Sequence, residues 1–274
     1  MPELPDIAIL AKSMHQALSG RSIFDSVVHQ PKVLNRSVQS FQQAVKGRSF
    51  QKIWQRGKWV LCRLDGDLLL ALNLGMGGEV RLHRPIEVHN PKRERVAFFL
   101  SDNDQLWVNF WWFGYVHLIE ADRLSQHPQL GTLGPEPLDE EFTAEKLASM
   151  LEGKRGRIKS YLLDQRFIAG IGNVYVQDIL WYAKLHPDRK ANTLSSADIE
   201  KLHSAIQQIL KEGIRWGPGP GERDVWGNRG LWGKRRGWPH VGYRIGEPCP
   251  TCKTPIEELR VGSTKSYICP KCQT

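Results

Sequence analysis

Two closely spaced cysteine pairs near the end of the chain limit its possible fold more strongly than any other feature. Cys249 and Cys252 form one pair, Cys269 and Cys272 the other, and sixteen residues separate the pairs. Each CxxC turn presents two sulfur atoms to one ion, and four soft ligands match the tetrahedral preference of Zn²⁺. Four thiolates leave no open coordination position, so we expect one structural zinc ion. The intervening residues suffice for a β-hairpin whose folding depends on the metal.

The composition indicates an intracellular protein with a polyanionic partner. In a reducing compartment the cysteine pairs favour a metal over disulfides. The sequence has no run of about eighteen apolar residues and no basic signal-peptide region near its start. The formal net charge is +9, and residues 211–274 hold twelve Lys or Arg against six Asp or Glu. We expect a monomer that binds nucleic acid and no membrane, in the cytoplasm with the nucleoid if the source is bacterial. A solvated basic surface without such a partner is the alternative.

Residues 1–130 predict a helix followed by an all-β domain. Ile7, Leu10, Met14 and Leu18 fall on one helical face, and Gly20 provides a stop. Because this helix begins a few residues after the terminus, its packing would fix the terminus in space. Eight short strand patterns at the spacing of a β-sandwich or barrel follow, at 22–28, 50–54, 59–64, 68–74, 80–83, 95–100, 105–110 and 115–120.

Residues 131–243 predict a helical domain, and residues 244–274 the zinc finger. A Pro- and Gly-rich linker starts at His127, and helical patterns follow at 143–151, 158–164 and 174–184. Asn173 suits the N-cap of the last of these, and Ser195 with Asp198 suits the start of a longer helix that ends at Gly213. Residues 216–243 are rich in Gly, Trp and Arg and are typical of a mobile loop.

Six motifs in a fixed order resemble the formamidopyrimidine-DNA glycosylase family. They are PELP at 2–5, Lys58 in RGKWVL, LGMGG at 74–78, LGPEPL at 133–138, GIGNVY at 171–176 and the four-Cys finger. The endonuclease VIII branch has a similar layout, but LGMGG and LGPEPL are closer to the first branch. The resemblance implies an α+β fold. It comprises an N-terminal β-sandwich with an N-terminal helix, a helical domain with a helix–two-turn–helix motif, and a C-terminal β-hairpin zinc finger.

The resemblance also implies a bifunctional DNA glycosylase and AP lyase of base excision repair. Its substrates would be oxidised bases in double-stranded DNA, chiefly purines such as 8-oxoguanine and formamidopyrimidines. Removal of Met1 exposes the amine of Pro2, and an α-amine with a pKa near 8 is partly neutral at physiological pH. Its attack on the sugar C1′ expels the base and leaves an iminium, which permits β- and then δ-elimination. Glu3 would move protons, and Lys58 would hold the neighbouring phosphate or assist proton transfer.

The DNA contacts implied by the resemblance are only partly matched. Met76 and Phe113 match two of the three residues that fill the space left by an extruded base. Trp111 stands at the third position, where the family has Arg, so we expect weaker discrimination of the opposite base. A buried core position is the alternative for Trp111. Lys159 and Asn173 match the positions that grip phosphates, and Asn173 at a helix start adds backbone donors.

Further departures leave the substrate and the affinity open. Asn73 stands where the family has His, Gly77 where it has Ser, and Asp6 where it has Glu. Thr264 replaces an Arg of the finger, and the adjacent Lys265 can substitute only as a point charge. These changes motivate a second hypothesis, a non-catalytic or weakly catalytic DNA-damage-binding paralogue. The intact Pro2-Glu3 terminus argues against it.

The loop 216–243 lies where the family closes over an extruded base, but its sequence diverges, so the resemblance does not imply a standard 8-oxoguanine pocket. Interleaved tryptophans and arginines suit stacking on bases and contact with phosphates. A disordered basic segment is the alternative. The residues concerned are Trp216, Trp226, Trp232, Trp238, Arg223, Arg229, Arg235 and Arg236.

Overall fold

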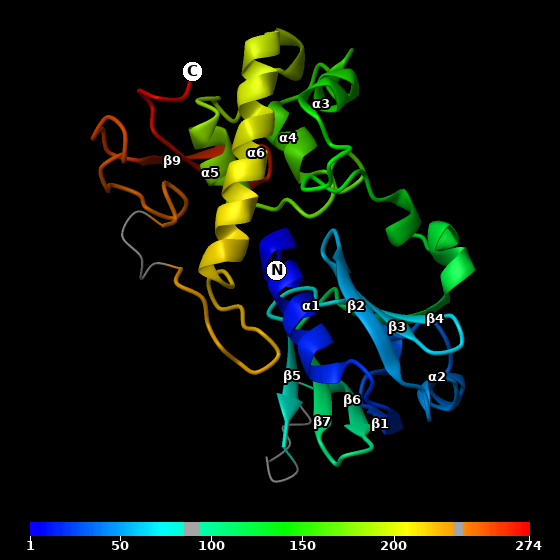
Figure 1. The fold of residues 1–274 in the computed structure, drawn as a ribbon. Coiled ribbons are helices and arrows are strands. Elements are labelled where there is room, and N and C mark those ends of the chain that lie inside the picture. Colours follow the sequence, from blue (N-terminus) through cyan, green and yellow to red (C-terminus); the bar gives the residue numbers. More distant parts are fainter. Residues whose placement is uncertain (85–93, 233–237) are drawn as a thin grey trace. The chain divides into compact units, whose positions relative to one another are not determined.

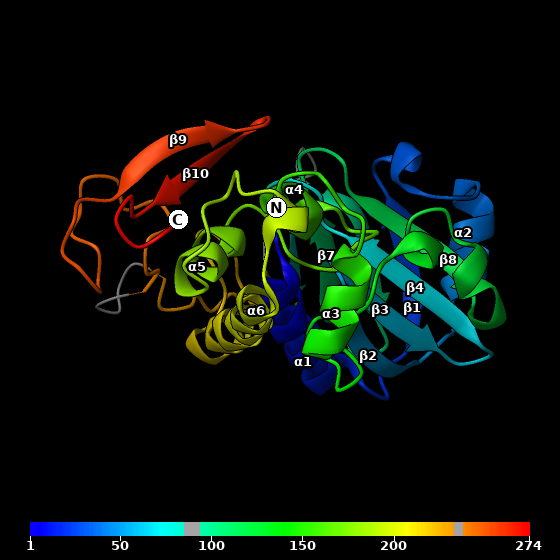
Figure 2. The same ribbon diagram turned by 90° about the horizontal axis from the view of Figure 1, so that it is seen from above.

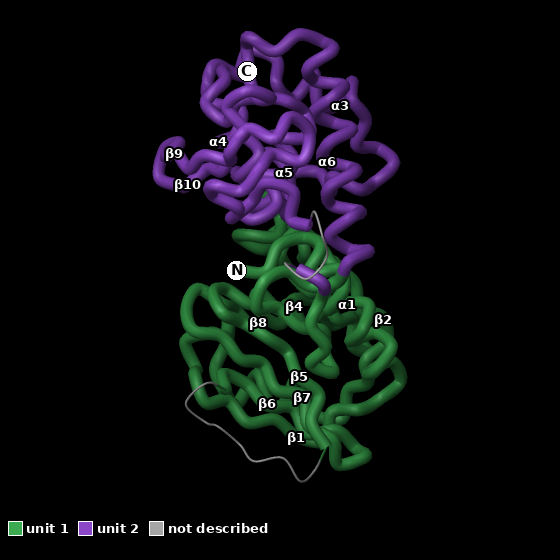
Figure 3. Tube along the Cα trace, turned by 90° about the vertical axis from the view of Figure 1, so that its left-hand side faces the viewer, with its two compact units in different colours: residues 1–132, 217–230 green, residues 133–216, 231–274 purple. Residues whose placement is uncertain are grey.

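The computed structural model describes residues 1–84, 94–232 and 238–274, which form two compact units (Figure 3). Unit 1 comprises residues 1–132 and 217–230, and unit 2 comprises residues 133–216 and 231–274. The expected helical domain at 131–243 is therefore divided, because residues 217–230 pack with the β domain. Arg235 and Arg236 of the expected loop lie outside the described residues.

Helix α1 (Leu4–Leu18) opens unit 1 and lies along strand β2 (Phe50–Arg56; Figure 1). Pro5 lies in its first turn, and Glu3 and Asp6 form a reciprocal capping box at its start. The predicted face is buried, with Ile7, Met14 and Leu18 at most 1% exposed. Burial of this face fixes the start of the chain against the β domain, as expected from the sequence.

Two four-stranded antiparallel sheets form the predicted β-sandwich. The strand orders are β1-β6-β7-β5 and β2-β3-β4-β8. Alternate side chains from both sheets enter one apolar core, and Cys62 is fully buried in it, where burial raises the pKa of the thiol. The other strands are β1 Ile23–Val28, β3 Trp59–Leu64, β4 Leu68–Asn73, β5 Glu79–His83, β6 Glu94–Leu100, β7 Gln105–Asn109 and β8 Tyr115–Glu120. Each corresponds to a strand expected from the sequence.

Short helices connect these strands, and the sequence patterns did not predict them. Helix α2 (Val38–Val45) has Ser37 as its N-cap and buries Phe41 and Val45. At eight residues it is too short for a helical period to stand out from noise. Among the described residues, 3₁₀ turns lie at Pro31–Val33, Ala121–Gln126 and Leu130–Thr132 in unit 1 and at Ala191–Thr193 in unit 2.

Unit 2 contains the expected helices and the expected hairpin. The helices are α3 (Ala144–Leu151), α4 (Ile158–Leu163), α5 (Tyr175–Tyr182) and α6 (Ser196–Trp216). Helix α5 has Val174 and not Asn173 at its N-cap. Helix α6 continues past Gly213, because this glycine is buried in the packed face of the helix. Strands β9 (Glu257–Val261) and β10 (Thr264–Ile268) form the hairpin, and β10 contacts α5 (Figure 2).

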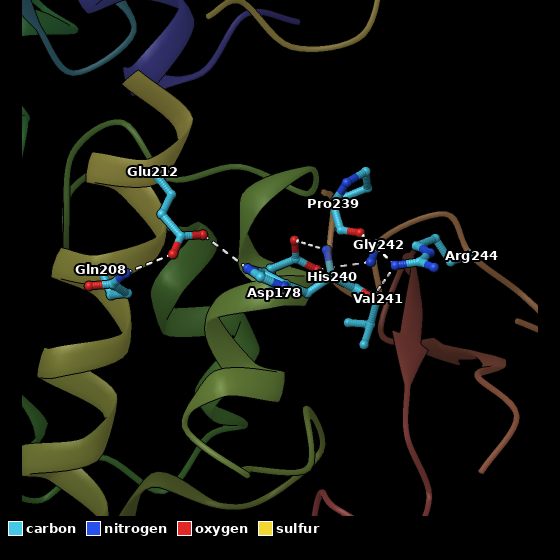
Figure 4. Close-up of polar contacts among 8 residues, drawn as sticks. All are labelled: Asp178, Gln208, Glu212, Pro239, His240, Val241, Gly242 and Arg244. Carbon is cyan, nitrogen blue, oxygen red and sulfur yellow. Dashed lines mark hydrogen bonds and ion pairs between the residues drawn. The ribbon is translucent and has the colours of Figure 1, made fainter. Parts of the chain in front are cut away.

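Asp178 on α5 fixes the end of the predicted loop within unit 2 (Figure 4). Its carboxylate accepts the backbone N–H groups of His240, Val241 and Gly242 at 2.8, 2.8 and 2.9 Å. The His240 ring lies 2.9 Å from a carboxylate oxygen of Glu212 on α6. The segment after residue 237 is therefore anchored and is not the unpacked loop expected from its composition. Within the described ranges, no helix has the length and apolar character needed to cross a lipid bilayer.

Candidate active site and nucleic-acid interface

The start of the chain brings the three expected catalytic residues together in unit 1. Met1 is 52% exposed, whereas Pro2 is buried and Glu3 is only 3% exposed. Lys58 lies in the turn between β2 and β3 and faces the carboxylates of Glu3 and Asp6. Burial lowers the pKa of the Lys58 ammonium, and the two carboxylates partly offset this shift. The local chemistry therefore combines a chain-terminal amine, a carboxylate and a lysine.

Residues 217–230 are hydrogen-bonded to this part of unit 1. The Asp6 carboxylate accepts the backbone N–H of Gly219 at 2.6 Å, and the Ser13 hydroxyl accepts that of Val225 at 3.1 Å. The Val225 carbonyl accepts the N–H of Leu82 on β5 at 2.9 Å. Three backbone groups of the segment thus have partners on α1 and β5, so the segment is packed against unit 1 and is not the unpacked loop expected from its composition.

Sequence reasoning missed Glu222, which the anchored segment carries to the same place. Burial raises the pKa of its carboxyl group to about 8, and the negative charges of Asp6, Glu3 and Glu79 add to this shift. The positive amino terminus acts in the opposite direction. In the sequence, Glu222 is one charge in a Gly- and Pro-rich stretch, so no local signal distinguishes it from an exposed surface residue.

The residues expected to fill the place of an extruded base also lie together in unit 1. Met76 and Trp111 are joined through the Trp111 N–H and the Met76 carbonyl at 2.9 Å, and the Met76 N–H donates to the Trp112 carbonyl at 2.9 Å. Met76, Trp111 and Phe113 are 45, 46 and 71% exposed. Trp111 is therefore not a core residue, and all three apolar side chains are exposed.

Two of the departures from the family pattern are structurally linked. A Cβ atom added at Gly77 would lie 2.2 Å from Cδ1 of the Trp111 indole, far inside van der Waals contact. Gly77 also has a φ of +62°, which favours glycine. The indole at position 111 thus occupies the space that a side chain at position 77 would need. The presence of Trp111 and the absence of a side chain at position 77 are therefore sterically linked.

Asn73 supports the turn that carries Met76. Its side-chain oxygen accepts the N–H of Gly75 at 3.1 Å, and its amide nitrogen lies 3.4 Å from the Lys58 carbonyl. Asn73 therefore connects the Met76 turn to the turn that holds Lys58.

Lys159, Asn173 and Lys265 form a second cluster, within unit 2. The Lys159 side chain donates to the Lys265 carbonyl at 2.6 Å and to the Ser266 hydroxyl at 2.7 Å, and the residue is 1% exposed. Burial lowers the pKa of its ammonium to about 8. Gln177 donates to the Asn173 side chain at 3.2 Å and to the Lys265 carbonyl at 3.2 Å. Lys159 thus holds the hairpin, whereas Lys265 is exposed and pairs with Glu258 at 2.9 Å.

The four expected metal ligands lie together at the base of the hairpin. The sulfur atoms of Cys249, Cys252, Cys269 and Cys272 are all within 4.8 Å of one another. This spacing and the all-thiolate donor set fit one tetrahedral Zn²⁺ with no open position. The chain therefore has a closed, structural zinc site, as its cysteine spacing predicts.

Known proteins resemble this chain over its full length. Residues 1–110 match the formamidopyrimidine-DNA glycosylase N-terminal domain, residues 133–222 the H2TH domain, and residues 246–274 the zinc finger found in FPG and IleRS. The formamidopyrimidine-DNA glycosylase of Chloroflexus aurantiacus is 37% identical over 277 residues, covering 100% of this chain and 98% of that one. That of Desulforamulus reducens is 36% identical over 276 residues, covering 100% and 99%. A solved complex of the Lactococcus lactis Fpg with DNA containing an abasic site has a TM-score of 0.90 and 28% identity, covering 99% of each chain.

Proposed function

Because the chain belongs to the formamidopyrimidine-DNA glycosylase family, and is thus a base-excision-repair glycosylase that acts on damaged DNA, we propose that it excises bases through the Pro2 amine. Attack on the sugar C1′ forms a covalent Schiff-base intermediate, and the same site then cleaves the strand by β- and δ-elimination. The observation that carries this proposal is the burial of Pro2 and Glu3 beside Lys58, at the start of a capped and packed helix. A terminus held in this way is positioned for covalent catalysis at little entropic cost.

The neighbouring side chains have distinct tasks in this mechanism. Glu3 takes the proton from the Pro2 nitrogen after attack and returns it to the sugar ring oxygen as the ring opens. Lys58, which faces the carboxylates of Glu3 and Asp6, contacts the phosphate next to the lesion. Both residues lie within the same unit as Pro2, so no movement between the units is needed to assemble them.

The preferred substrates are oxidised purines in double-stranded DNA. Met76, Trp111 and Phe113 fill the space that the extruded nucleotide leaves, because exposed apolar side chains can wedge between stacked bases. Trp111 stacks on the orphaned base but lacks the donors with which Arg would read it. Asn73 supports the turn that carries Met76 by accepting the N–H of Gly75.

Unit 2 grips the phosphate backbone. Asn173 and the exposed Lys265 contact phosphates, and the zinc ion stabilises the hairpin that carries Lys265. Lys159 acts indirectly by holding that hairpin, in place of the direct phosphate contact implied by the family resemblance.

Borohydride trapping tests the Pro2 mechanism. The chain beginning at Pro2 is compared with the same chain carrying a short extension before Pro2, each verified by mass spectrometry. We expect a covalent adduct with a duplex containing an abasic site or 8-oxoguanine from the first protein only. Equal trapping by both proteins would refute the role of the Pro2 amine. DNA binding without any adduct would favour the second hypothesis, a damage-binding paralogue, which the substitution of Trp111 for Arg motivates.

A further inference from the structure

Glu222 lies midway between two backbone anchors that attach its segment to the catalytic end of unit 1. Gly219, three residues before it, donates to Asp6, and Val225, three residues after it, donates to Ser13. The Glu222 N–H itself donates to the Gly219 carbonyl at 3.1 Å, which turns the chain at this point. Helix α1 therefore holds Glu222 beside the amino terminus, although the two are more than 200 residues apart in sequence.

The charged groups that face Glu222 lie at the start of α1 and on β5. The amino terminus, Glu3 and Asp6 face it from the start of α1, and Glu79 faces it from β5. Lys58 faces the same carboxylates of Glu3 and Asp6 from the turn between β2 and β3.

The charged neighbours of Glu222 on its own segment are turned toward other partners. Arg223 donates to the Gly227 carbonyl at 3.1 Å, and Asp224 accepts the N–H groups of Trp226 and Asn228 at 3.0 and 2.8 Å. On β5, Arg81 lies 3.4 Å from the carbonyl oxygen of Trp226.

We propose that Glu222 is the acid that protonates the damaged base as the bond between the base and C1′ breaks, a role that rests on the Pro2 mechanism proposed above. The Pro2 nitrogen uses its lone pair to form the bond to C1′. The electron pair of the breaking C1′–N bond stays on the base, which takes the proton of the Glu222 carboxyl group. The products are a protonated sugar–proline adduct, a neutral base and a Glu222 carboxylate, so atoms and charge balance.

The environment of Glu222 suits this role in two ways. The base is one bond away from the carbon that Pro2 attacks, so a group held beside the terminus lies close to the departing base. A carboxyl group with a pKa of about 8, raised mainly by burial, still holds its proton at pH 7, whereas an ordinary glutamate does not. A further carboxylate beside Glu3 and Asp6 would favour the protonated form of the Pro2 amine. Because Glu222 is neutral, it does not have this effect.

The E222Q variant separates base expulsion from the later chemistry. Single-turnover excision is measured on a duplex with 8-oxoguanine opposite cytosine, and borohydride trapping on the same duplex with an aldehydic abasic site. The abasic site has no base to expel, so it needs no acid at this step. We expect E222Q to excise about 100-fold more slowly at pH 7 and to trap the abasic site at the wild-type rate. The decline of wild-type excision above about pH 8 should disappear in E222Q.

D224N serves as the matched comparison, because the Asp224 carboxylate accepts hydrogen bonds from Trp226 and Asn228 and so stabilises the internal turn of the same segment. If D224N disturbs the structure of the segment, it should slow excision and trapping of the abasic site to a similar extent. The same joint loss in E222Q would overturn the proposal, as would unchanged excision by E222Q. If the wild-type protein forms no adduct with the abasic duplex, the Pro2 mechanism itself fails, and the role of Glu222 falls with it.

Discussion

The carboxylate of Asp6 accepts the backbone N–H of Gly219 at 2.6 Å and so connects residues 213 positions apart. Its second oxygen accepts the N–H of Glu3 at 2.8 Å. One side chain therefore caps α1, orients the residue after Pro2 and anchors residues 217–230. A segment whose composition is typical of a free loop becomes part of the catalytic unit through this contact.

Asp6→Ala tests this double anchor. The substitution leaves two buried N–H groups without their acceptor, and we expect the free energy of unfolding to fall by about 3 kcal/mol. Hydrogen exchange should accelerate at residues 217–230, because their anchor to α1 is lost. Glu140→Ala, which removes an exposed carboxylate, is the control and should change stability by less than about 0.5 kcal/mol. Wild-type exchange in the segment would show that Asp6 does not hold it.

The contact between Gly77 and Trp111 predicts coupled substitutions. A side chain at position 77 must displace the indole, so Gly77→Ala should reduce 8-oxoguanine excision in a protein that retains Trp111. Once Trp111→Ala has removed the indole, the same change should cost less, apart from the strain of the positive φ. We expect a coupling energy of about 1 kcal/mol or more from single-turnover rates of the two single variants and the double variant. Additive effects would contradict the steric link.

Trp111→Arg tests the reading of the opposite base. The exposed indole can stack on any orphaned base, so we expect wild-type excision to vary little among the four opposite bases. An Arg side chain adds donors and should introduce a preference among them. The measurement is the excision rate of 8-oxoguanine opposite each base in turn. A strong preference for cytosine in the wild-type protein would count against stacking as the main contact.

The two clustered lysines of unit 2 should have separable effects. Lys159→Met removes a buried ammonium that holds the hairpin, so we expect lower stability, by about 2 kcal/mol, with little change in the salt dependence of DNA binding. Lys265→Met removes an exposed cation, so the slope of log K against log salt should decrease by about 0.9 with stability unchanged. Urea unfolding and binding titrations at several salt concentrations measure both. A reduced slope for Lys159→Met would indicate direct phosphate contact.

Metal analysis checks the finger. We expect one zinc per chain, and Cys269→Ser should lose the metal and the affinity for DNA because the hairpin no longer folds. Cys62→Ala is the matched control, since it removes a buried thiol of the sandwich but should keep one zinc. Zinc retained at full occupancy in Cys269→Ser would refute the four-ligand site.

A pair of buried histidines predicts a loss of stability in acid. The Nδ1 atom of His117 on β8 lies 2.8 Å from the Nε2 atom of His127. Burial lowers the pKa of both side chains, that of His117 to about 4. An unfolded histidine titrates near 6.5, so the unfolded state binds more protons between about pH 4 and 6.5. Stability should therefore rise with pH across this window. His117→Phe should reduce this slope by up to about one proton in urea unfolding at several pH values, and an unchanged slope would exclude His117 as the cause.

The sequence alone determined the features that depend on near neighbours in the chain. The spacing of the four cysteines specified a metal site, short strand patterns specified eight strands, and the apolar face of Ile7 to Leu18 with Gly20 specified the first helix. The tertiary structure decided whether charges and loops were buried. Lys159 reads as a surface residue and is buried, and Glu222 reads as a solvated charge and faces the amino terminus. Burial and long-range hydrogen bonds depend on which distant segments the fold brings together, and no local pattern around residues 6, 77 or 222 encodes those partners.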